Sequence, residues 1–546
     1  KFGGHTVNAL VGGEFYDNKS YFNSGFARGA ATDLIPWLAA STAPSVLGTT
    51  IINSAGAYSN FSGWERISSA ITRVNYTYLN KYLLTGIVRV DGSSRLKKGN
   101  YFGTFPGVSV GWNLHNEEFF KGSSLSKYIS SIKPRFSYGV NGNVNSLGLY
   151  ATAQVYNNAG TYNGFGGTYA ASYINPDVRW ERAKSTNYGL DLGLFNERIS
   201  INIDYFVRNV FDKIAGLGIS AQTGFTSYST NLGKLQNKGI ELAISGKILK
   251  SATPDGLNLE AGLNYFHVKS FAKKLPYNAL PGNRTSGFFV WDPKNPTQQI
   301  YVGGLVEGQR IGLDEVWAPK WDGIYTDAAA IAADANVWNT FLPYGNRRIK
   351  QLGDARWHMV NKNDTIDAKQ FVYVGRTTPQ HTGGFYLAGS FKGINLYAGF
   401  DYAFGFVILN NEILRGLSQV QGSQNQTSEA LNTWSPTNPN GTLPRFYWAN
   451  QGRNYATDAS GNNPPANMWE KGDYVMLREL TLSYDLSSQI IGKFLANKIK
   501  GLSVNITGSN LIYFSGYSGN FPEVGGFDQG KFPLPKRLTF GVRVTL

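Results

Sequence analysis

The strongest constraint on this chain is an alternation of apolar and polar residues that recurs over stretches of about ten residues. In RISINIDYFVRN, Ile199, Ile201 and Ile203 share one face, while Asn202 and Asp204 share the other. The segments TNYGLDLGLF and INLYAGFDYAF alternate in the same way. Because successive side chains of a strand point to opposite faces, each segment predicts a β-strand with one apolar and one polar face.

The length of these strands separates two all-β architectures. Strands of soluble sandwiches run about 5–6 residues, whereas membrane-spanning strands need about 9–11. Asp, Arg and Asn on the polar faces suit a water-filled or plugged lumen rather than a dry core. We therefore predict a transmembrane antiparallel β-barrel. The side chains expected to face the lipid include Leu190, Leu192, Leu194, Ile199, Ile201 and Ile203.

The predicted connections alternate in length. Tight turns are expected at 79–82, 195–198 and 392–394. Long loops rich in Gly, Asn and Tyr are expected at 16–65, 143–180, 271–380 and 411–473. Short turns at one end of the strands and long loops at the other are typical of outer-membrane barrels.

The alternation predicts about fourteen strands. If the tight turns face the periplasm, the parity of this series places the C-terminus in the periplasm as well. The closing segment KRLTFGVRVTL suits a strand that pairs with a neighbour to remove a sheet edge. The predicted strands are 5–16, 66–79, 82–93, 105–115, 131–142, 181–195, 198–211, 232–249, 256–270, 381–391, 394–410, 473–486, 501–513 and 536–546.

Composition narrows the class further. Charged residues make up only 16% of the 546 residues, below the roughly 25% of soluble domains. The net charge is +15, but no basic run is longer than Lys97-Lys98 or Arg347-Arg348, so no nucleic-acid partner is predicted. With Cys 0, a disulfide framework and Cys-ligated metal are excluded. The chain opens on strand-like sequence, which suggests the C-terminal part of something longer.

The sequence contains short matches to catalytic motifs, but the surrounding residues do not support a catalytic role. GVSVG contains Ser109 in the pattern of a nucleophile elbow, but that chemistry needs a strand–turn–helix, and the segment reads as an alternating strand. The five histidines have no paired metal-ligand spacing. We therefore predict no enzyme, no cofactor and no catalytic residue.

The segment VNKNDTID (360–367) resembles the start of a calcium loop. With Met359 at position 1, Asp364 stands where the turn needs Gly, and Gln370 stands where a bidentate carboxylate is needed. Only Asp367 supplies a carboxylate at a ligand position. The pattern favours an Asn/Asp-rich turn, so no metal site is predicted.

Several tryptophans fall in the predicted long loops. A girdle or packing role is the simpler reading for each one. The alternative is stacking on sugar rings or contact with apolar peptide side chains. The candidate residues for contact with cargo or a partner are Trp291, Trp317, Trp321, Trp434 and Arg445.

An ordered series of motifs resembles the SusC/RagA-type TonB-dependent outer-membrane transporters of Bacteroidetes. These motifs include GIVRVDGSSR, FPGVSVGWNLHNEEFF, KPRFSYGVNGN, INPDVRWERAKSTNYGLDLGLFNERI, NLGKLQNKGIELAI, GDYVMLRELTLSYDL, GSNLIYFSGYSG with FPEV, and LTFGVRVTL. GDARWHMVNKNDTIDAKQ is similar to a loop of that family, but Met359 and Asn363 replace acidic residues and Lys362 and Asp364 replace glycines. The segment matches that loop in spacing but lacks most of its acidic residues.

The resemblance implies a barrel of 22 strands with an N-terminal plug, so that residues 1–546 would be its C-terminal part. It also implies a SusD-like surface lipoprotein, energy from TonB–ExbB–ExbD through the plug, and contact with outer-membrane lipid and lipopolysaccharide (LPS). The cargo would be an oligosaccharide or an oligopeptide. Two alternatives stay open at this point. One is a siderophore or cobalamin receptor, and the other is a non-transporting barrel that acts as a scaffold or adhesin.

Overall fold

The computed structural model describes residues 3–27, 45–47, 50–52, 55–253, 255–334, 350–364, 367–418, 425–447, 452–455, 464–486 and 501–545. The chain divides into two compact units. The first comprises Lys1–Val110, Ser137–Thr186 and Asn209–Lys234, and the second comprises Gly111–Phe136, Asn187–Arg208 and Leu235–Leu546. No helix among the described residues is long and apolar enough to cross a membrane.

Among the described residues, the principal sheet contains 14 strands. Each of these strands pairs with the strands of this sheet that come directly before and after it along the chain. The predicted strand series is thereby confirmed. The strands are β1 (His5–Ala27), β4 (Ala55–Tyr78), β5 (Tyr82–Ser93), β6 (Phe102–Trp112), β7 (Ile129–Asn143), β10 (Glu181–Leu194), β11 (Ile199–Gly218), β12 (Ser227–Leu249), β13 (Asn258–Lys274), β20 (His381–Phe391), β21 (Ile394–Phe404), β24 (Tyr474–Leu486), β25 (Gly501–Ser515) and β27 (Arg537–Thr545).

The remaining elements lie in the connections. The first unit carries β2 (Ser45–Leu47), β3 (Thr50–Ile52), β8 (Tyr156–Tyr162) and β9 (Phe165–Ala170). The second unit carries β14 (Phe288–Asp292), β15 (Asn295–Val302), β16 (Glu315–Ala318), β17 (Trp321–Ile324), β18 (Ala355–Trp357), β19 (Val372–Arg376), β22 (Val407–Asn410), β23 (Trp469–Lys471), β26 (Phe527–Asp528), and the helices α1 (Glu118–Lys121), α2 (Ala328–Ala333), α3 (Asn411–Ser418) and α4 (Gly452–Tyr455).

The tight turns follow from backbone conformation. Leu79 and Asn80 between β4 and β5 have φ of 49° and 54°, and Lys392 and Gly393 between β20 and β21 have φ of 49° and 82°. Two consecutive residues with positive φ match the twist of a two-residue hairpin. These turns are therefore hairpin connections, as the sequence predicts.

Two sequence predictions about strand ends are wrong. Residues 16–65 are not one loop, because β1 and β4 stay paired from Tyr16↔Ile67 to Ala27↔Ala55. Backbone pairing needs no apolar face, so polar sequence did not stop these strands. The predicted strand 394–410 is also too long. Gly405, with φ of 78°, ends β21 at Phe404, and β22 joins a separate three-stranded sheet.

The pairing register of β21, β24, β25 and β27 separates two faces of the sheet. Leu396 pairs with Leu482, Leu482 with Ile506, and Ile506 with Phe540, so these four residues form an apolar row. The next row pairs Asn395 with Ser483 and Ser483 with Asn505. Because neighbouring rows point to opposite sides, this part of the sheet has one apolar and one polar face. We call them the apolar face and the polar face.

The apolar face is open rather than covered by other elements. The exposed fraction is 48% for Leu396, 46% for Leu482 and 72% for Phe540. An exposed apolar row across four strands, continued by the alternating strand β20 beside β21, is typical of a sheet that contacts lipid. The Ser109 segment lies inside β6, so the strand–turn–helix needed by a nucleophile elbow is absent at this position.

Candidate functional site

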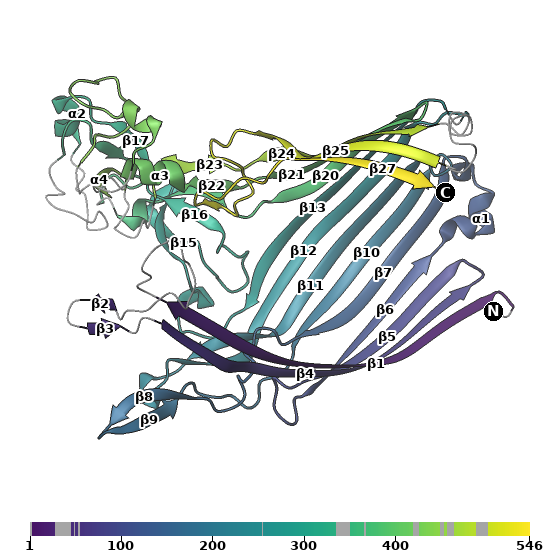
Figure 1. Ribbon diagram of the computed structural model, residues 1–546, viewed down its shortest axis with the longest axis horizontal. Coiled ribbons are helices and arrows are strands. Elements are labelled where there is room, and N and C mark those ends of the chain that lie inside the picture. The colour runs from purple at the N-terminus through teal and green to yellow at the C-terminus, as the bar shows by residue number, and fades with distance from the viewer. Residues whose placement is uncertain are drawn as a thin grey trace. The chain divides into compact units, whose positions relative to one another are not determined.

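Three long connections of the second unit pack together. We call the described residues between β13 and β20, between β21 and β24, and between β25 and β27 the loop body. Within it β22 pairs antiparallel with β23 and parallel with β26, so the second and third of these connections share one sheet. Figure 1 shows α2, α3, β17 and β22 grouped beyond the ends of β20, β21 and β24.

The loop body has its own cores. Ile408 is 0% exposed and packs with Tyr517 and Phe521, and Leu409 packs with Leu414 and Tyr455. Three further buried residues form a third group, namely Val290, Val302 and Phe371. The Ile408 group joins the second and third connections, and Trp321 of the first connection packs against the Leu409 group, so the three connections are held together.

Trp291 is half-buried and contacts the Asn/Asp-rich segment. Its Nε1 donates to Asp364 Oδ2 at 3.0 Å, and the Lys369 ammonium lies 5.5 Å from its ring centroid. Lys369 Nζ is 2.6 Å from Asp364 Oδ2 and 3.3 Å from Asp367 Oδ2. The hydrogen bond to Asp364, together with both carboxylate charges, raises the pKa of Lys369. The cation beside these carboxylates is therefore a lysine of the chain itself.

This cluster joins one lysine to two carboxylates, Asp364 and Asp367. In the parts of the chain that the structure describes, no group of three or more His, Asp or Glu side chains is arranged to hold a metal ion. Residues 365 and 366 of the segment lie outside the described residues.

Trp317 and Trp321 are half-buried packing residues of two small sheets. Trp317 Nε1 donates to Glu315 Oε2 at 3.2 Å, and its ring meets Tyr373 edge-on at 5.4 Å between centroids. Trp321 pairs with Trp357 across β17 and β18. Its Nε1 is buried and has no hydrogen-bond partner among the described residues.

Trp434 and Arg445 are brought together. Trp434 is 7% exposed, and the Arg445 guanidinium lies 6.0 Å from its ring centroid and 4.9 Å from that of Tyr447. Arg445 Nη1 also donates to Gln351 Oε1 at 3.0 Å. The Trp434 ring covers Gly353 so closely that a Cβ there would lie 2.1 Å from Trp434 Cε3. The five sequence candidates thus belong to different packing groups, apart from this pair.

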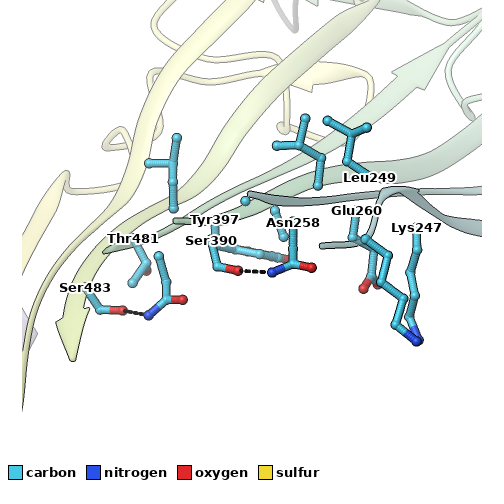
Figure 2. A pocket seen from close by; sticks show the side chains of 14 residues that line it. Lys247, Leu249, Asn258, Glu260, Ser390, Tyr397, Thr481 and Ser483 are labelled. Atoms are coloured by element: carbon cyan, nitrogen blue, oxygen red, sulfur yellow. Dashed lines mark hydrogen bonds between the residues drawn. The ribbon is translucent and has the colours of Figure 1, made fainter. Parts of the chain in front are cut away.

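The polar face of the second unit carries a hollow of about 370 Å³, lined by β12, β13, β20, β21 and β24. Figure 2 shows Asn258, Ser390 and Tyr397 along it, with Glu260 and Lys247 at one end. Asn258 Nδ2 donates to Ser390 Oγ at 3.3 Å. A second hollow of about 360 Å³ lies nearby on the same face, since Tyr397 lines both.

Tyrosines project from the polar face between these hollows. Tyr386 Oη donates to Glu260 Oε1 at 2.5 Å, and its ring stacks on Tyr397 with 5.9 Å between centroids. Gly262, which pairs with Tyr386, leaves room for the ring, because a Cβ there would lie 2.2 Å from Tyr386 Cε1. This wall offers hydroxyl, amide and carboxylate groups and a stacked aromatic pair to a polar solute.

An ion cluster fastens the loop body to the polar face. Arg478 of β24 donates to Asp401 of β21, at 3.0 Å for Nε and Oδ1, and also to Glu523 of the loop body. Tyr513 Oη donates to the same Glu523 at 3.0 Å. The connection between β25 and β27 is therefore tied to the sheet by a charge-assisted contact.

A second ion cluster lies on the same face of β7, β10 and β11. Arg135 binds Asp191 in a bidentate fashion, with Nε–Oδ2 at 2.9 Å and Nη2–Oδ1 at 2.7 Å, and Nη2 reaches Asp204 at 3.0 Å. Gly189 lies under the cluster, since a Cβ there would meet Arg135 Cζ at 2.6 Å. Strand alternation then puts Ile201 and Leu192 on the opposite, apolar face.

Sequence reasoning placed Asp191, Asp204 and Asp401 on polar faces but missed their partners. The signal available was parity, because an Arg on the polar face of a neighbouring strand is within reach of such an Asp. The Lys369 contact had no comparable signal, since it depends on a turn whose path the sequence does not fix.

Comparison with known proteins identifies the family. A family described as "TonB dependent receptor-like, beta-barrel" matches residues 2–344. The chain belongs to this family. The TonB-dependent receptor P3 of Formosa agariphila is 26% identical over 559 residues, which cover 100% of this chain and 51% of that protein. The TonB-dependent receptor SusC of Bacteroides thetaiotaomicron is 36% identical over 182 residues, which cover 32% of this chain and 18% of that protein.

Solved structures agree on the fold. The structure of the RagAB peptide transporter matches with a TM-score of 0.71 and 21% identity over 99% of this chain and 53% of that chain. The chain spans about half the length of the curated relatives it matches first. The predicted family and the all-β outer-membrane barrel class are confirmed.

Proposed function

We propose that this chain belongs to a TonB-dependent importer that takes up oligosaccharides or oligopeptides across the outer membrane with a SusD-like surface lipoprotein. The loop body carries the proposal. Long connections in a barrel usually serve binding rather than linkage, and here three of them are packed into one body with buried cores. A fixed surface of this kind suits repeated docking of a protein partner.

The surface of the loop body supports a protein partner. Leu431 is 85% exposed and Phe446 is 38% exposed, although both lie in a connection that buries most of its apolar residues. Apolar side chains held outward on a rigid body are typical of contact sites. The proposed contact residues for partner or cargo remain Trp291, Trp317, Trp321, Trp434 and Arg445. Trp434, at 7% exposed, would act by holding Arg445 and Gly353 in place.

The polar face supports passage of a polar cargo. Its amide and hydroxyl groups, including Asn258, Ser390 and Asn395, offer hydrogen bonds to hydroxyl groups of sugars and to amides of peptides alike. The RagAB proteins are called a peptide importer, so peptides are the first cargo to test. An upstream plug that receives energy from TonB–ExbB–ExbD is part of the same proposal.

Orientation can be tested by labelling single cysteines, because the sequence contains none of its own. The proposal places the loop body outside the cell and the short turns and the C-terminus in the periplasm. Leu431→Cys should react with a membrane-impermeant maleimide on intact cells. Asp255→Cys, in the short connection between β12 and β13, should react only after the outer membrane is opened. The reverse pattern would overturn the orientation.

Cargo can be tested by uptake in cells that carry or lack the TonB system. Fluorescent oligopeptides and oligosaccharides should be compared at equal concentration, with a labelled ferric siderophore as the third substrate. Import of a peptide or a glycan that stops when TonB is removed is the expected result. Import of the siderophore alone, or import unaffected by TonB, would contradict the proposal.

A further inference from the structure

The side of β13 that continues the apolar face changes composition along its length. Asn258 pairs with Ser390, and Ser390 pairs with Asn395 of the polar face, so Glu260 and Asn264, an even number of residues further along β13, lie on the polar face as well. The residues that alternate with them therefore lie on the opposite side. In order toward the loop body these residues are Leu259, Ala261, Leu263, Tyr265, His267, Lys269, Phe271 and Lys273. The surface thus passes from aliphatic to aromatic to cationic within one strand.

Two lysines converge on one ring at the cationic end. Lys238 Nζ of β12 lies 4.8 Å from the Phe271 ring centroid, and Lys273 Nζ lies 5.4 Å from it. No carboxylate of the described residues forms an ion pair with either lysine. Lys269, on the same side of β13, is exposed. We call Lys238, Lys269, Phe271 and Lys273 the basic–aromatic cluster.

A layer of amphipathic rings separates this cluster from the aliphatic residues. The His267 and His381 rings stack with 4.9 Å between centroids, and Tyr265 Oη is 2.7 Å from His381 Nδ1. Rings with one apolar and one polar edge concentrate where hydrocarbon meets headgroups. The sequence of layers along β13 is therefore that of a membrane boundary, with the lysines at the level of the headgroups.

From this arrangement, we infer that the basic–aromatic cluster binds the phosphate group of a lipid in the outer leaflet of the outer membrane. The inference rests on the proposed function, because the proposed orientation puts the loop body, and hence this end of β13, outside. Three ammonium groups, none of them in an ion pair with a carboxylate of the described residues, match a phosphate in charge. The adjoining apolar face receives the acyl chains of the same lipid, which a free phosphate lacks.

The same arrangement recurs in the first unit. Lys184 of β10 and Lys234 of β12 lie with Nζ at 5.0 and 5.3 Å from the Phe211 ring centroid. The strands on either side of Phe211 each supply one of these lysines, just as β12 supplies Lys238 beside Phe271. The recurrence supports a surface adapted to one repeated ligand, as lipids are.

The test compares two double variants of the purified full-length protein in neutral detergent. Lys238→Gln with Lys273→Gln removes two charges from the cluster and keeps most of each side-chain stem. Lys247→Gln with Lys250→Gln removes the same charge beside the hollow at the other end of β12. Each protein is titrated with phosphorylated lipid A, with the same lipid after removal of its phosphates, and with inorganic phosphate. Bound lipid is counted by native mass spectrometry.

The unaltered protein should retain phosphorylated lipid A, and the cluster variant should bind it roughly 30-fold more weakly, because each lysine near an anionic surface contributes about 1 kcal/mol. The control variant should bind like the unaltered protein. Equal losses in both variants, equal retention of the dephosphorylated lipid, or displacement by inorganic phosphate at equal concentration would each overturn the inference. Cargo uptake is measured separately, so failure of lipid binding is distinguishable from failure of the proposed function.

Discussion

An arginine placed at the centre of the apolar face should destabilise the folded protein strongly, whereas an arginine at the next residue should not. Leu480 and Thr481 of β24 are the matched pair. Leu480 pairs with Ala398 and Thr481 pairs with Tyr397 of β21, so the two side chains point to opposite faces. Thr481 lies two residues from Ser483, which pairs with Asn395 in the polar row, so Thr481 points to the polar face.

The expected magnitude follows from the depth of Leu480. Strand β21 has 11 residues, which at about 3.3 Å per residue and a tilt of about 40° span roughly 28 Å of membrane normal. Ala398 stands near the middle of that strand, so Leu480 beside it lies near the bilayer midplane. Arginine at the midplane of a lipid-facing surface costs about 2–4 kcal/mol. Thr481→Arg, on the polar face, should cost less than about 1 kcal/mol.

The assay is equilibrium unfolding in urea of the protein folded into lipid vesicles. Leu480→Arg should lower the free energy of unfolding by the amount given, and Thr481→Arg should stay close to the unaltered protein. If the two variants have the same free energy of unfolding, or if Thr481→Arg has the lower one, then the apolar face does not contact lipid and the assignment of the two faces is refuted.

Three further perturbations test the loop body. Lys369→Met removes the cation beside Asp364 and should destabilise this turn by about 1 kcal/mol, measured as faster hydrogen exchange, and unchanged exchange would argue against the contact. Gly353→Ala forces a Cβ into the Trp434 ring at a residue with φ of 83° and should expose that ring to quenching by iodide, so an unquenched ring would contradict the packing. A hydrogen bond from the Leu275 amide, joined by one from Asn283, lowers the pKa of Glu307. The stability that Glu307 contributes should therefore be complete above its unfolded pKa and be lost as pH falls through its lower folded pKa. Glu307→Gln should remove this dependence of local stability on pH, which is measured by hydrogen exchange of the Leu275 amide.

The strand series could be predicted from sequence because the lipid imposes it. A strand that contacts hydrocarbon on one side and water on the other must alternate, and it must be long enough to cross. Where a strand extends beyond the lipid, its residues no longer need to alternate, and the sequence no longer predicts where the strand ends. Beyond Tyr16 the polar residues of β1 and β4 no longer alternate, yet the backbones remain paired to Ala27 and Ala55.

The interior of the loop body could not be predicted because its order is set by contacts between distant segments. Trp434 has the sequence context of an exposed loop residue, yet it is buried and packs against Gly353, which belongs to another connection. Gly405 was visible in the sequence, but a lone glycine does not reveal that its φ is positive and that the strand ends there. The ion clusters of the polar face could be predicted in part. Alternation along each strand places the carboxylates on the polar face, but it does not identify the arginines that pair with them.

The parallel pairing of β22 with β26 bears on the order in which this protein can assemble. Leu409 pairs with Phe527, so the edge that completes the three-stranded sheet is supplied by a segment near the end of the chain. Contacts between residues so far apart in sequence form slowly, because the loop between them must close first. The buried residues around Ile408 therefore lack this edge until Phe527 and Asp528 are in place. During that interval their apolar surface is exposed, so the stretch before β24 is the part of the loop body most prone to aggregate before the fold is complete.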